Sequence, residues 1–464
     1  MDMVVKRPLL NVLLYCALAI FASSMLIVWY DDVGWHDQQR IFQIALLWVV
    51  ALVAWKVPLR NLNLCAFSGV SLLFLLGAMS SLCAKHPAWA FIEWARYLGL
   101  FLLALLVGQL AREFRWQQYV VHLVGACAVL SVFQFLVSYL TVVFSGMHFF
   151  TAEMLFGGFS NPRFLAQFQV LAMPALAWLT LYHFRFCGRL NSGFAVLFFC
   201  GLVVQWCLAL SLAGRGLWLG LMVSSLLLVV VFPRFWRLLV VQVVAALAGA
   251  LSFYLLFRVV PDWLGAEVLV QDSLRMGLSN RDVIWRLAWD MATANPWLGV
   301  GPMHFSAIVN SVAAHPHQVV LQWLSEWGVG ATLIALLLGG VGVWHALSFL
   351  RQQDAQDMDA SLWLSILGAL VLAQVDGIFV MPYVETWLAI FLGLALARWP
   401  GCGPDSNFQV VSLRLMTLPV LVILGYVLFF DVPHLQENTY QQLTENGKMW
   451  APRFWGVGWI PWND

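Results

Sequence analysis

The chain has 464 residues, of which 62% are hydrophobic and only 10% are charged. Since an average soluble domain carries roughly 25% charged residues, this composition excludes a soluble globular enzyme, and it also excludes a disordered chain, which needs low hydrophobicity and high net charge. The formal net charge of +1 supplies no basic surface, so no nucleic-acid partner is expected. The composition predicts an all-α fold, that of a polytopic helical membrane protein surrounded by membrane lipid.

Membrane-spanning helices are marked by stretches of about 20 mainly apolar residues. Taken in chain order, such stretches predict about 12–13 transmembrane helices. We place them at 9–29, 41–55, 64–83, 94–111, 119–143, 165–184, 194–212, 217–232, 238–257, 319–348, 361–380, 384–398 and 415–430. The first is longer than the apolar core of a signal peptide, about 7–15 residues, and is expected to be retained. The tenth is long enough to hold an additional half-helix.

The basic residues orient these spans, because cytoplasmic loops carry an excess of Lys and Arg. Pairs such as Lys6 and Arg7, or Arg234 and Arg237, fall on the side of the N-terminus, so we expect the N-terminus inside and the C-terminus outside. The chain then divides into about nine spans over 1–257, an outer loop over 258–318, further spans over 319–430, and an outer tail over 431–464. The tail carries tryptophans that we expect to form an aromatic belt at the membrane interface: Trp450, Trp455, Trp459 and Trp462.

The large outer loop contains an amphipathic helix. The stretch Ser279-Asn280-Arg281-Asp282 has the pattern of a helix start, and the helix should end at Asn295 because Pro296 follows. Its apolar residues fall on one face at helical spacing: Ile284, Leu287, Ala288 and Met291. We expect this helix to pack on the outer face of the membrane-embedded part.

Charged residues inside or beside a membrane are costly, so each is a candidate functional group. Arg215 lies between Gly214 and Gly216 in the break between two apolar spans, where a guanidinium can bind a phosphate through two hydrogen bonds. The alternative is an interfacial anchor whose side chain reaches the lipid headgroups. Arg281 and Arg286 lie nearly one and a half turns apart on the loop helix, so they should point to different sides, and at least one should face solvent or headgroups.

Two histidines, His315 and His317, lie on either side of a proline where the tenth span begins. A histidine suits proton abstraction because its ordinary pKa of about 6.5 lies near neutral pH, and a structural role in the loop is the other interpretation. Two histidines can also hold a metal, but a third ligand such as His304 would have to be brought close by the fold. The eight cysteines show no zinc-ligand spacing, so no metal site is expected.

Acidic residues are also predicted inside or next to spans. Glu326 is expected either to pair with an arginine or to orient the site, and Asp376 is placed toward the outer end of the span at 361–380. Each could be a buried structural acid, or part of the relay of a proton-coupled transporter. Glu93 and Arg96 are three residues apart and predict an ion pair on one helix near the outer surface.

Three stretches of the loop region stand out together: Arg281-Asp-Val-Ile-Trp285, Asn295-Pro-Trp-Leu-Gly-Val-Gly-Pro302 and His315-Pro-His-Gln-Val-Val-Leu-Gln-Trp-Leu-Ser-Glu-Trp-Gly328. They resemble the O-antigen ligase superfamily. That group contains lipopolysaccharide O-antigen ligases, O-antigen polymerases and the bacterial protein O-oligosaccharyltransferases that modify pilins. Two further stretches are similar to family elements that precede a span: Ser211-Leu-Ala-Gly-Arg215 and Gly158-Phe-Ser-Asn161-Pro-Arg163-Phe.

The likeness covers roughly residues 150–345. The ligases show His followed by Asn, Ser or Gln, then nine residues, Gly, two residues, and Gly, Thr or Tyr. His317-Gln318 and Gly328 fit this pattern, whereas Ala331 departs from its last position. The run from His315 into Leu-Gln-Trp-Leu is more similar to the pilin-modifying branch.

The resemblance implies a multi-pass inner-membrane glycosyltransferase with its active site on the periplasmic face and with no cofactor or metal. The donor would be a glycan on undecaprenyl diphosphate, and the acceptor a hydroxyl of a pilin-type protein or of lipid A-core. Arg215 and Arg281 would bind the diphosphate, and His317 would act as general base, so that direct displacement inverts the anomeric centre. Supporting roles would fall to His315, Arg163, Arg286, Glu326 and Asn161.

The sequence leaves other functions open. An O-antigen polymerase, in which the acceptor is a second lipid-linked glycan, shares the donor chemistry. A transporter would need repeats between the two halves and charges at mid-bilayer. A non-catalytic assembly factor would not need His317.

Overall fold

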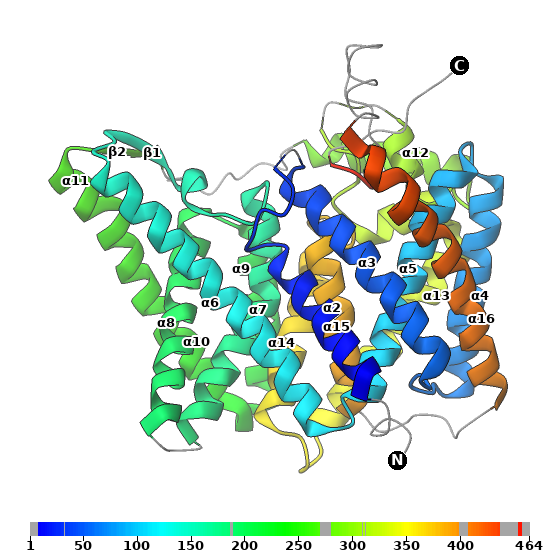
Figure 1. Ribbon diagram of the computed structural model, residues 1–464, viewed down its shortest axis with the longest axis horizontal. Coiled ribbons are helices and arrows are strands. Elements are labelled where there is room, and N and C mark those ends of the chain that lie inside the picture. The colour runs from blue at the N-terminus through cyan, green and yellow to red at the C-terminus, as the bar shows by residue number, and fades with distance from the viewer. Residues whose placement is uncertain are drawn as a thin grey trace.

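Long helices run side by side in alternating directions in the computed structural model of the chain (Figure 1). The structure describes residues 8–31, 33–185, 189–269, 280–308, 310, 312–398, 407–436 and 453–456. Each of the predicted spans coincides with one helix. These helices are α2 (Pro8–Ser23), α3 (Trp35–Lys56), α4 (Leu64–Cys83), α5 (Pro87–Leu110), α6 (Phe114–Phe144), α7 (Pro162–Arg185), α8 (Arg189–Ser211), α9 (Arg215–Val231), α10 (Trp236–Tyr254), α13 (Val319–Leu350), α14 (Asp357–Leu372), α15 (Pro382–Arg398) and α16 (Asn407–Tyr426).

Within the described ranges, nine of these helices are long and apolar enough to cross a membrane, and α2, α9, α14 and α15 are shorter. The prediction of an all-α, multi-pass membrane protein is therefore confirmed. The start of α2 and the end of α16 lie on opposite sides of the bundle, as an odd number of crossings requires (Figure 1). We call the side on which helix α12 lies the α12 side. Since the helices alternate, α3, α5, α7, α9, α13 and α15 all begin there.

Short elements complete the α12 side. Helix α10 continues through the π-helix η3 (Leu255–Val259) into α11 (Val260–Leu264). The strand β1 (Phe149–Thr151) pairs in parallel with β2 (Glu267–Leu269). The 3-10 helices on this side are η1 (Ala152–Leu155), η4 (His304–Ala307) and η6 (Val432–His434), and η6 follows a second π-helix, η5 (Val427–Asp431), at the end of α16. The 3-10 helix η2 (Pro233–Phe235) lies between α9 and α10 on the opposite side.

The amphipathic helix of the outer loop is confirmed as α12 (Arg281–Ala294). Its buried residues include three from the predicted apolar face: Ile284, Ala288 and Met291. It ends as expected at Asn295, whose N–H donates to the carbonyl of Met291 at 3.1 Å. The start differs from the prediction, because Asn280 precedes the helix in a left-handed conformation and makes no side-chain cap. Ser279 lies outside the described residues.

Helix α13 is interrupted near its start, where Gly328 adopts φ 81° and ψ 174°. The carbonyls of 325–326 lose their helical partners there and accept hydrogen bonds of 2.9 and 3.0 Å from the N–H groups of 300–301. In return, the N–H of Val329 donates to the carbonyl of Pro296 at 2.8 Å. The glycine-rich loop therefore completes the backbone hydrogen bonding of the kink, and the family-like Gly328 is explained by backbone geometry.

Glycines allow two pairs of helices to approach closely. A Cβ added at Gly220 of α9 would lie 2.6 Å from the carbonyl oxygen of Gly368 on α14, and Gly216 lies against Leu372 at the end of α14. On α15, Gly393 lies against the backbone of α5. Small residues at helix interfaces permit such contacts in membranes. They bring the start of α9 next to the turn after α14, and the second half of α15 next to the second half of α5.

The tail segment 453–456 is buried against the membrane helices. Arg453 and Trp455 are each 4% exposed, and Phe454 is fully buried. The prediction of an interfacial aromatic belt is therefore wrong for Trp455, because this part of the tail returns into the helical bundle. The other tryptophans of the predicted belt, Trp450, Trp459 and Trp462, lie outside the described residues.

We expect Gly328→Ala to destabilise the protein by about 2 kcal/mol or more, because a Cβ there would lie 2.2 Å from the carbonyl oxygen of Trp297 and would hold a positive φ. Gly339→Ala on the same helix is the matched control, since nothing lies within 4 Å of its Cβ position. The measurement is the midpoint of thermal unfolding in detergent. Equal midpoints for the two variants would contradict this account of the kink.

Candidate functional site

A cavity of about 380 Å³ lies on the α12 side, between the starts of α7, α9 and α12 and the turn that follows α14. A space of this size suits a small ligand or the headgroup of a larger one. The polar side chains that line it are Glu153, Ser160, Asn161, Arg163, Arg215, Arg281 and Asp376. The cavity thus gathers residues from four separate parts of the chain.

Three arginines converge on this cavity, each in the first turn of a helix. Arg163 is the second residue of α7, Arg215 is the first of α9, and Arg281 is the first of α12. A helix N-terminus carries a positive partial charge and unpaired N–H groups, which favour anions. Three helix starts and three guanidinium groups therefore direct positive potential into one space, and such a potential favours an anion there.

The local sequence places two of these arginines. The Asn161 side chain caps α7, its Oδ1 accepting the N–H of Arg163 at 2.9 Å, while Pro162 occupies the first helical position. Gly214 precedes α9, and a Cβ there would lie 3.0 Å from the Cβ of Ala166 on α7. The absence of a side chain at Gly214 lets the starts of α7 and α9 stand close together.

The neighbouring charges in the cavity affect the pKa of Arg281. Burial lowers the pKa of this guanidinium below its ordinary value; Asp376 opposes the shift, while Arg163 and Arg215 add to it. Like charges held close together disfavour one another's charged forms. An anion placed among these three arginines relieves that repulsion, which is the electrostatic basis for binding.

A histidine and a carboxylate adjoin the arginines. The Nδ1 atom of His317 lies 3.2 Å from Oδ1 of Asp376, and Asp376 itself lines the cavity. The Nε2 atom of His315 lies 3.1 Å from the same Nδ1. All three residues are buried. His317 and His315 do not themselves line the cavity; His317 is connected to the cavity that Arg215 lines through its contact with Asp376.

The contacts around His317 assign its tautomer. A single hydrogen on Nδ1 accounts for both short distances, since it is donated to the Asp376 carboxylate with Nε2 of His315 as a second acceptor. This leaves Nε2 of His317 as the ring nitrogen that can accept a proton. His317 also adopts φ 53°, a left-handed conformation that costs a non-glycine residue about 1–3 kcal/mol. The surrounding contacts hold the ring against that cost.

Asp376 lies in a different place from the one predicted. Helix α14 ends at Leu372, so Asp376 occupies the turn 373–381 before α15 and is not part of a span that reaches residue 380. Burial alone would raise the pKa of Asp376, but its contact with His317 and the N–H of Gly377, at 2.8 Å, bring the pKa below its ordinary value. Asp376 is therefore ionised at neutral pH.

His315 is neutral and fixed. Burial lowers its pKa well below the ordinary value, and a charge on His317 would lower it further. Gly377 makes room for the ring, because a Cβ at that position would lie 2.1 Å from Nε2 of His315. His315 is thus an uncharged neighbour of His317, and at neutral pH it carries no imidazolium proton that it could donate.

Other predicted residues do not line the cavity. Arg286 is exposed on α12 and, unlike Arg281, does not line the cavity, in keeping with the prediction that at least one of the two faces solvent or headgroups. Glu326 is buried and pairs with Arg453 at 2.6 Å, which is one of the two alternatives the sequence left open. His304 accepts the N–H of His86 at 3.0 Å. Within the described part of the chain, no group of three or more His, Cys, Asp or Glu side chains is arranged to hold a metal ion.

Sequence reasoning missed two features of the cavity. It did not connect Asp376 with His317, because 59 residues and two helices separate them. It also passed over Glu153, an exposed carboxylate in η1 that lines the same cavity. The only available signal was that Glu153 precedes the family-like stretch ending at Arg163, which is too weak to single it out.

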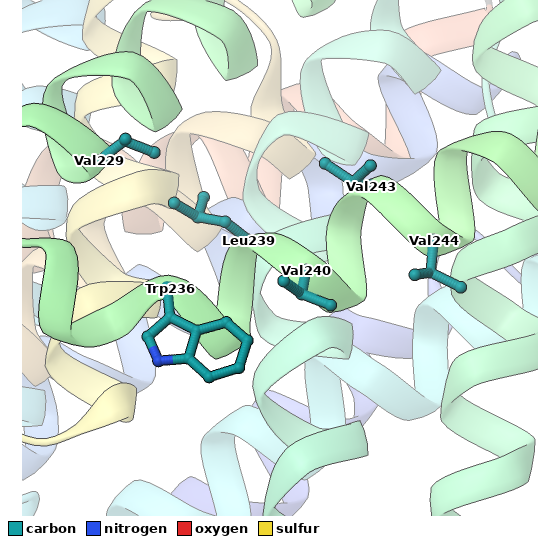
Figure 2. Close-up of a pocket in the computed structure, with 6 residues that line it drawn as sticks. All are labelled: Val229, Trp236, Leu239, Val240, Val243 and Val244. Carbon is teal, nitrogen blue, oxygen red and sulfur yellow. The ribbon is translucent and has the colours of Figure 1, made fainter.

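Another hollow, of about 300 Å³, is of a different kind. It lies at the far end of α9 from Arg215 and is lined by apolar side chains on α9 and α10: Val229, Trp236, Leu239, Val240, Val243 and Val244 (Figure 2). The indole nitrogen of Trp236 is the one hydrogen-bonding atom among the side chains drawn in this view. This hollow holds no group able to bind phosphate or move a proton.

The fold and the site define a class: a multi-pass membrane protein with an arginine-lined anion cavity and a histidine–carboxylate pair at one side of its helical bundle. Residues 196–336 match the O-Antigen ligase family. This match confirms the resemblance to the O-antigen ligase superfamily and supports a membrane glycosyltransferase of the ligase or polymerase type. No curated protein matches the chain.

The matched segment contains part of the site. It includes Arg215, Arg281 and both histidines, whereas Arg163 and Asp376 lie outside it. The matched segment and the cavity lining share residues 212–217 and Arg281.

We expect inorganic diphosphate to bind the purified protein and raise its midpoint of thermal unfolding. Arg215→Gln and Arg281→Gln should each weaken that binding about tenfold or more, since a hydrogen bond to a charged group contributes about 1.5–3 kcal/mol. Arg286→Gln is the matched control, because Arg286 shares α12 with Arg281 but does not line the cavity. Equal weakening in the control would show that diphosphate binds elsewhere.

Proposed function

We propose that this protein is an inner-membrane glycosyltransferase that moves a glycan from undecaprenyl diphosphate to a hydroxyl group of a periplasmic acceptor, either a pilin-type protein or lipid A-core. One observation carries the proposal: Arg163, Arg215 and Arg281 face the same cavity as the carboxylate that binds His317. A diphosphate site and a base stand side by side.

Arg163, Arg215 and Arg281 can stabilise a diphosphate leaving group. When the bond between the anomeric carbon and the phosphate oxygen breaks, negative charge grows on the diphosphate, and cations already in place stabilise it without reorganisation. Arg215 and Arg281 bind the diphosphate directly in this proposal. Arg163 is a third contact, and Asn161 serves by fixing the start of α7.

His317 suits the acceptor. A sugar, serine or threonine hydroxyl is a poor nucleophile, and a base within hydrogen-bond reach removes its proton in the transition state. Nε2 of His317 takes that proton while Nδ1–H remains bonded to Asp376, whose negative charge stabilises the resulting imidazolium. The new oxygen–carbon bond forms as the carbon–phosphate-oxygen bond breaks, so the anomeric configuration inverts and undecaprenyl diphosphate leaves.

The distribution of Lys and Arg indicates on which side of the membrane the cavity lies. Helix ends on the side opposite α12 carry an excess of Lys and Arg, among them Lys56, Arg112, Arg115, Arg234, Arg237, Arg398 and Arg414. By the positive-inside tendency this side is cytoplasmic, which puts the α12 side and its cavity in the periplasm. A lipid-linked donor in the outer leaflet then has its headgroup level with the arginines.

We expect His317→Ala to lower the transfer rate by about 10²–10⁴, the usual contribution of a general base. The assay combines purified protein, an undecaprenyl-diphosphate-linked glycan, and in parallel a pilin-type protein, lipid A-core or a second lipid-linked glycan. Arg215→Ala should lose activity comparably, because the leaving group is no longer stabilised. Arg286→Ala, exposed on α12, should retain the wild-type rate.

The variants, the acceptors and the chelator each test a separate part of the proposal. Wild-type activity in His317→Ala would show that His317 is not the general base and would contradict the proposed mechanism. Transfer to a second lipid-linked glycan alone would identify a polymerase and overturn the ligase proposal. The resemblance also implies that a chelator leaves the rate unchanged, so strong inhibition by a chelator would show that a metal takes part.

A further inference from the structure

Six charged side chains form a buried network on the α12 side, beside the cavity but not lining it. Each is no more than 4% exposed: Arg40, Glu93, Arg96, Glu326, Glu385 and Arg453. They come from α3, α5, α13, α15 and the tail segment 453–456. Three positive and three negative charges balance, so the network as a whole has no surplus charge with which to hold an ionic ligand.

The tail closes one end of this network. The guanidinium of Arg453 lies 2.6 Å from Oε1 of Glu326 and 2.9 Å from Oε1 of Glu93. Without Arg453, two buried carboxylates would lose a shared partner, and breaking a buried pair on one side costs about 3–5 kcal/mol. Glu93 also pairs with Arg96 at 2.9 Å, so the predicted helical pair is confirmed, although both side chains are buried.

The other end of the network makes hydrogen bonds to the turn 373–381. Arg96 and Arg40 both bind Glu385 at the start of α15, Arg40 at 2.6 Å. Their remaining donors reach backbone carbonyls of the turn. Arg40 Nη2 donates to Val380 at 2.8 Å and Arg96 Nη1 to Phe379 at 3.4 Å.

A third donor joins them from α5. The hydroxyl of Tyr97 donates to the carbonyl of Phe379 at 3.2 Å. Within the turn, the N–H of Val380 donates to the carbonyl of Gly377, the residue that follows Asp376. The turn that carries the His317 partner is thus held at two consecutive carbonyls, 379 and 380, by three side chains from α3 and α5.

Burying two arginines so deeply needs a reason beyond stability, because well-packed apolar residues of similar volume are often as stabilising as a buried ion pair. We infer that Arg40, Arg96 and Tyr97 are positioning residues that hold Asp376 against His317 and thereby set the orientation of the base. This inference rests on the function proposed above. It does not extend to the arginines of the cavity, which bind the leaving group.

Tyr97→Phe is the mildest test, because it removes one hydroxyl and keeps the ring. The expected result is a loss of transfer rate of about three- to tenfold, the scale of one hydrogen bond, with inorganic diphosphate binding unchanged. Rates are expressed per molecule that binds diphosphate, so a smaller folded fraction does not count as a loss. Arg40→Lys extends the test, since an ammonium can pair with Glu385 but lacks the fork that also reaches Val380.

A double-mutant cycle separates positioning from general support. If Tyr97 acts through Asp376, then Tyr97→Phe has little further effect once Asp376→Asn has removed the carboxylate. The matched control is Arg398→Gln. This change breaks the bidentate pair between Arg398 at the end of α15 and Asp359 near the start of α14, at 2.7 and 2.9 Å. These are the ends of α14 and α15 that lie away from the turn 373–381. The effect of Arg398→Gln per binding-competent molecule should be negligible.

The outcomes are distinct. Additive losses from Tyr97→Phe and Asp376→Asn, or an equal loss in Arg398→Gln, would overturn the inference while leaving the proposed function intact. Full activity in His317→Ala would overturn the proposed function itself, and the inference with it. Loss of diphosphate binding in Tyr97→Phe would show that the network supports the arginine cavity and not the base.

Discussion

The contact between Asp376 and His317 joins parts of the chain that are far apart in sequence, and the arrangement of the α12 side depends on it. The carboxylate faces three arginines in one direction and a buried ion network in the other, through the turn 373–381. The two charged sets differ in balance. Among the described residues that line it, the cavity has three positive charges, on Arg163, Arg215 and Arg281, and two negative charges, on Glu153 and Asp376, whereas the six residues of the network carry equal numbers. A surplus favours an external anion, and a neutral set holds parts of the protein together.

Helix geometry explains why these charges can coexist beside an apolar bundle. Alternating helices bring several N-termini to the same side, where their dipoles add to the guanidinium charges. Glycines at 216 and 220 let α9 approach α14, and Gly377 leaves room for His315. Gly328 kinks α13 directly after Glu326 and Trp327, so that the loop at 296–301 replaces the missing helical hydrogen bonds. The glycines thus set the distances at which the charged groups meet.

The fold was largely predictable, because spanning a membrane leaves the backbone few choices. Each apolar stretch became a helix, and α12 appeared where the amphipathic pattern required it. The site was predictable in part. Arg215, Arg281 and His317 could be singled out because charge and imidazole are rare in such a chain, but nothing in the spacing paired His317 with Asp376. Trp455 was misjudged for a related reason: an aromatic-rich tail has the same composition whether it lies on a membrane or returns into the bundle.

The sequence by itself determined the class of protein, the order of its main helices, and the residues with chemistry to offer, since hydropathy and charge act locally along the chain. The tertiary structure alone decided which of those residues meet. Arg281 enters the cavity and Arg286 does not, and Glu326 finds its partner in Arg453, 127 residues away. Long-range pairing of this kind depends on how the helices pack, and packing is set by surface shape and close glycine contacts, which no local pattern in the chain encodes.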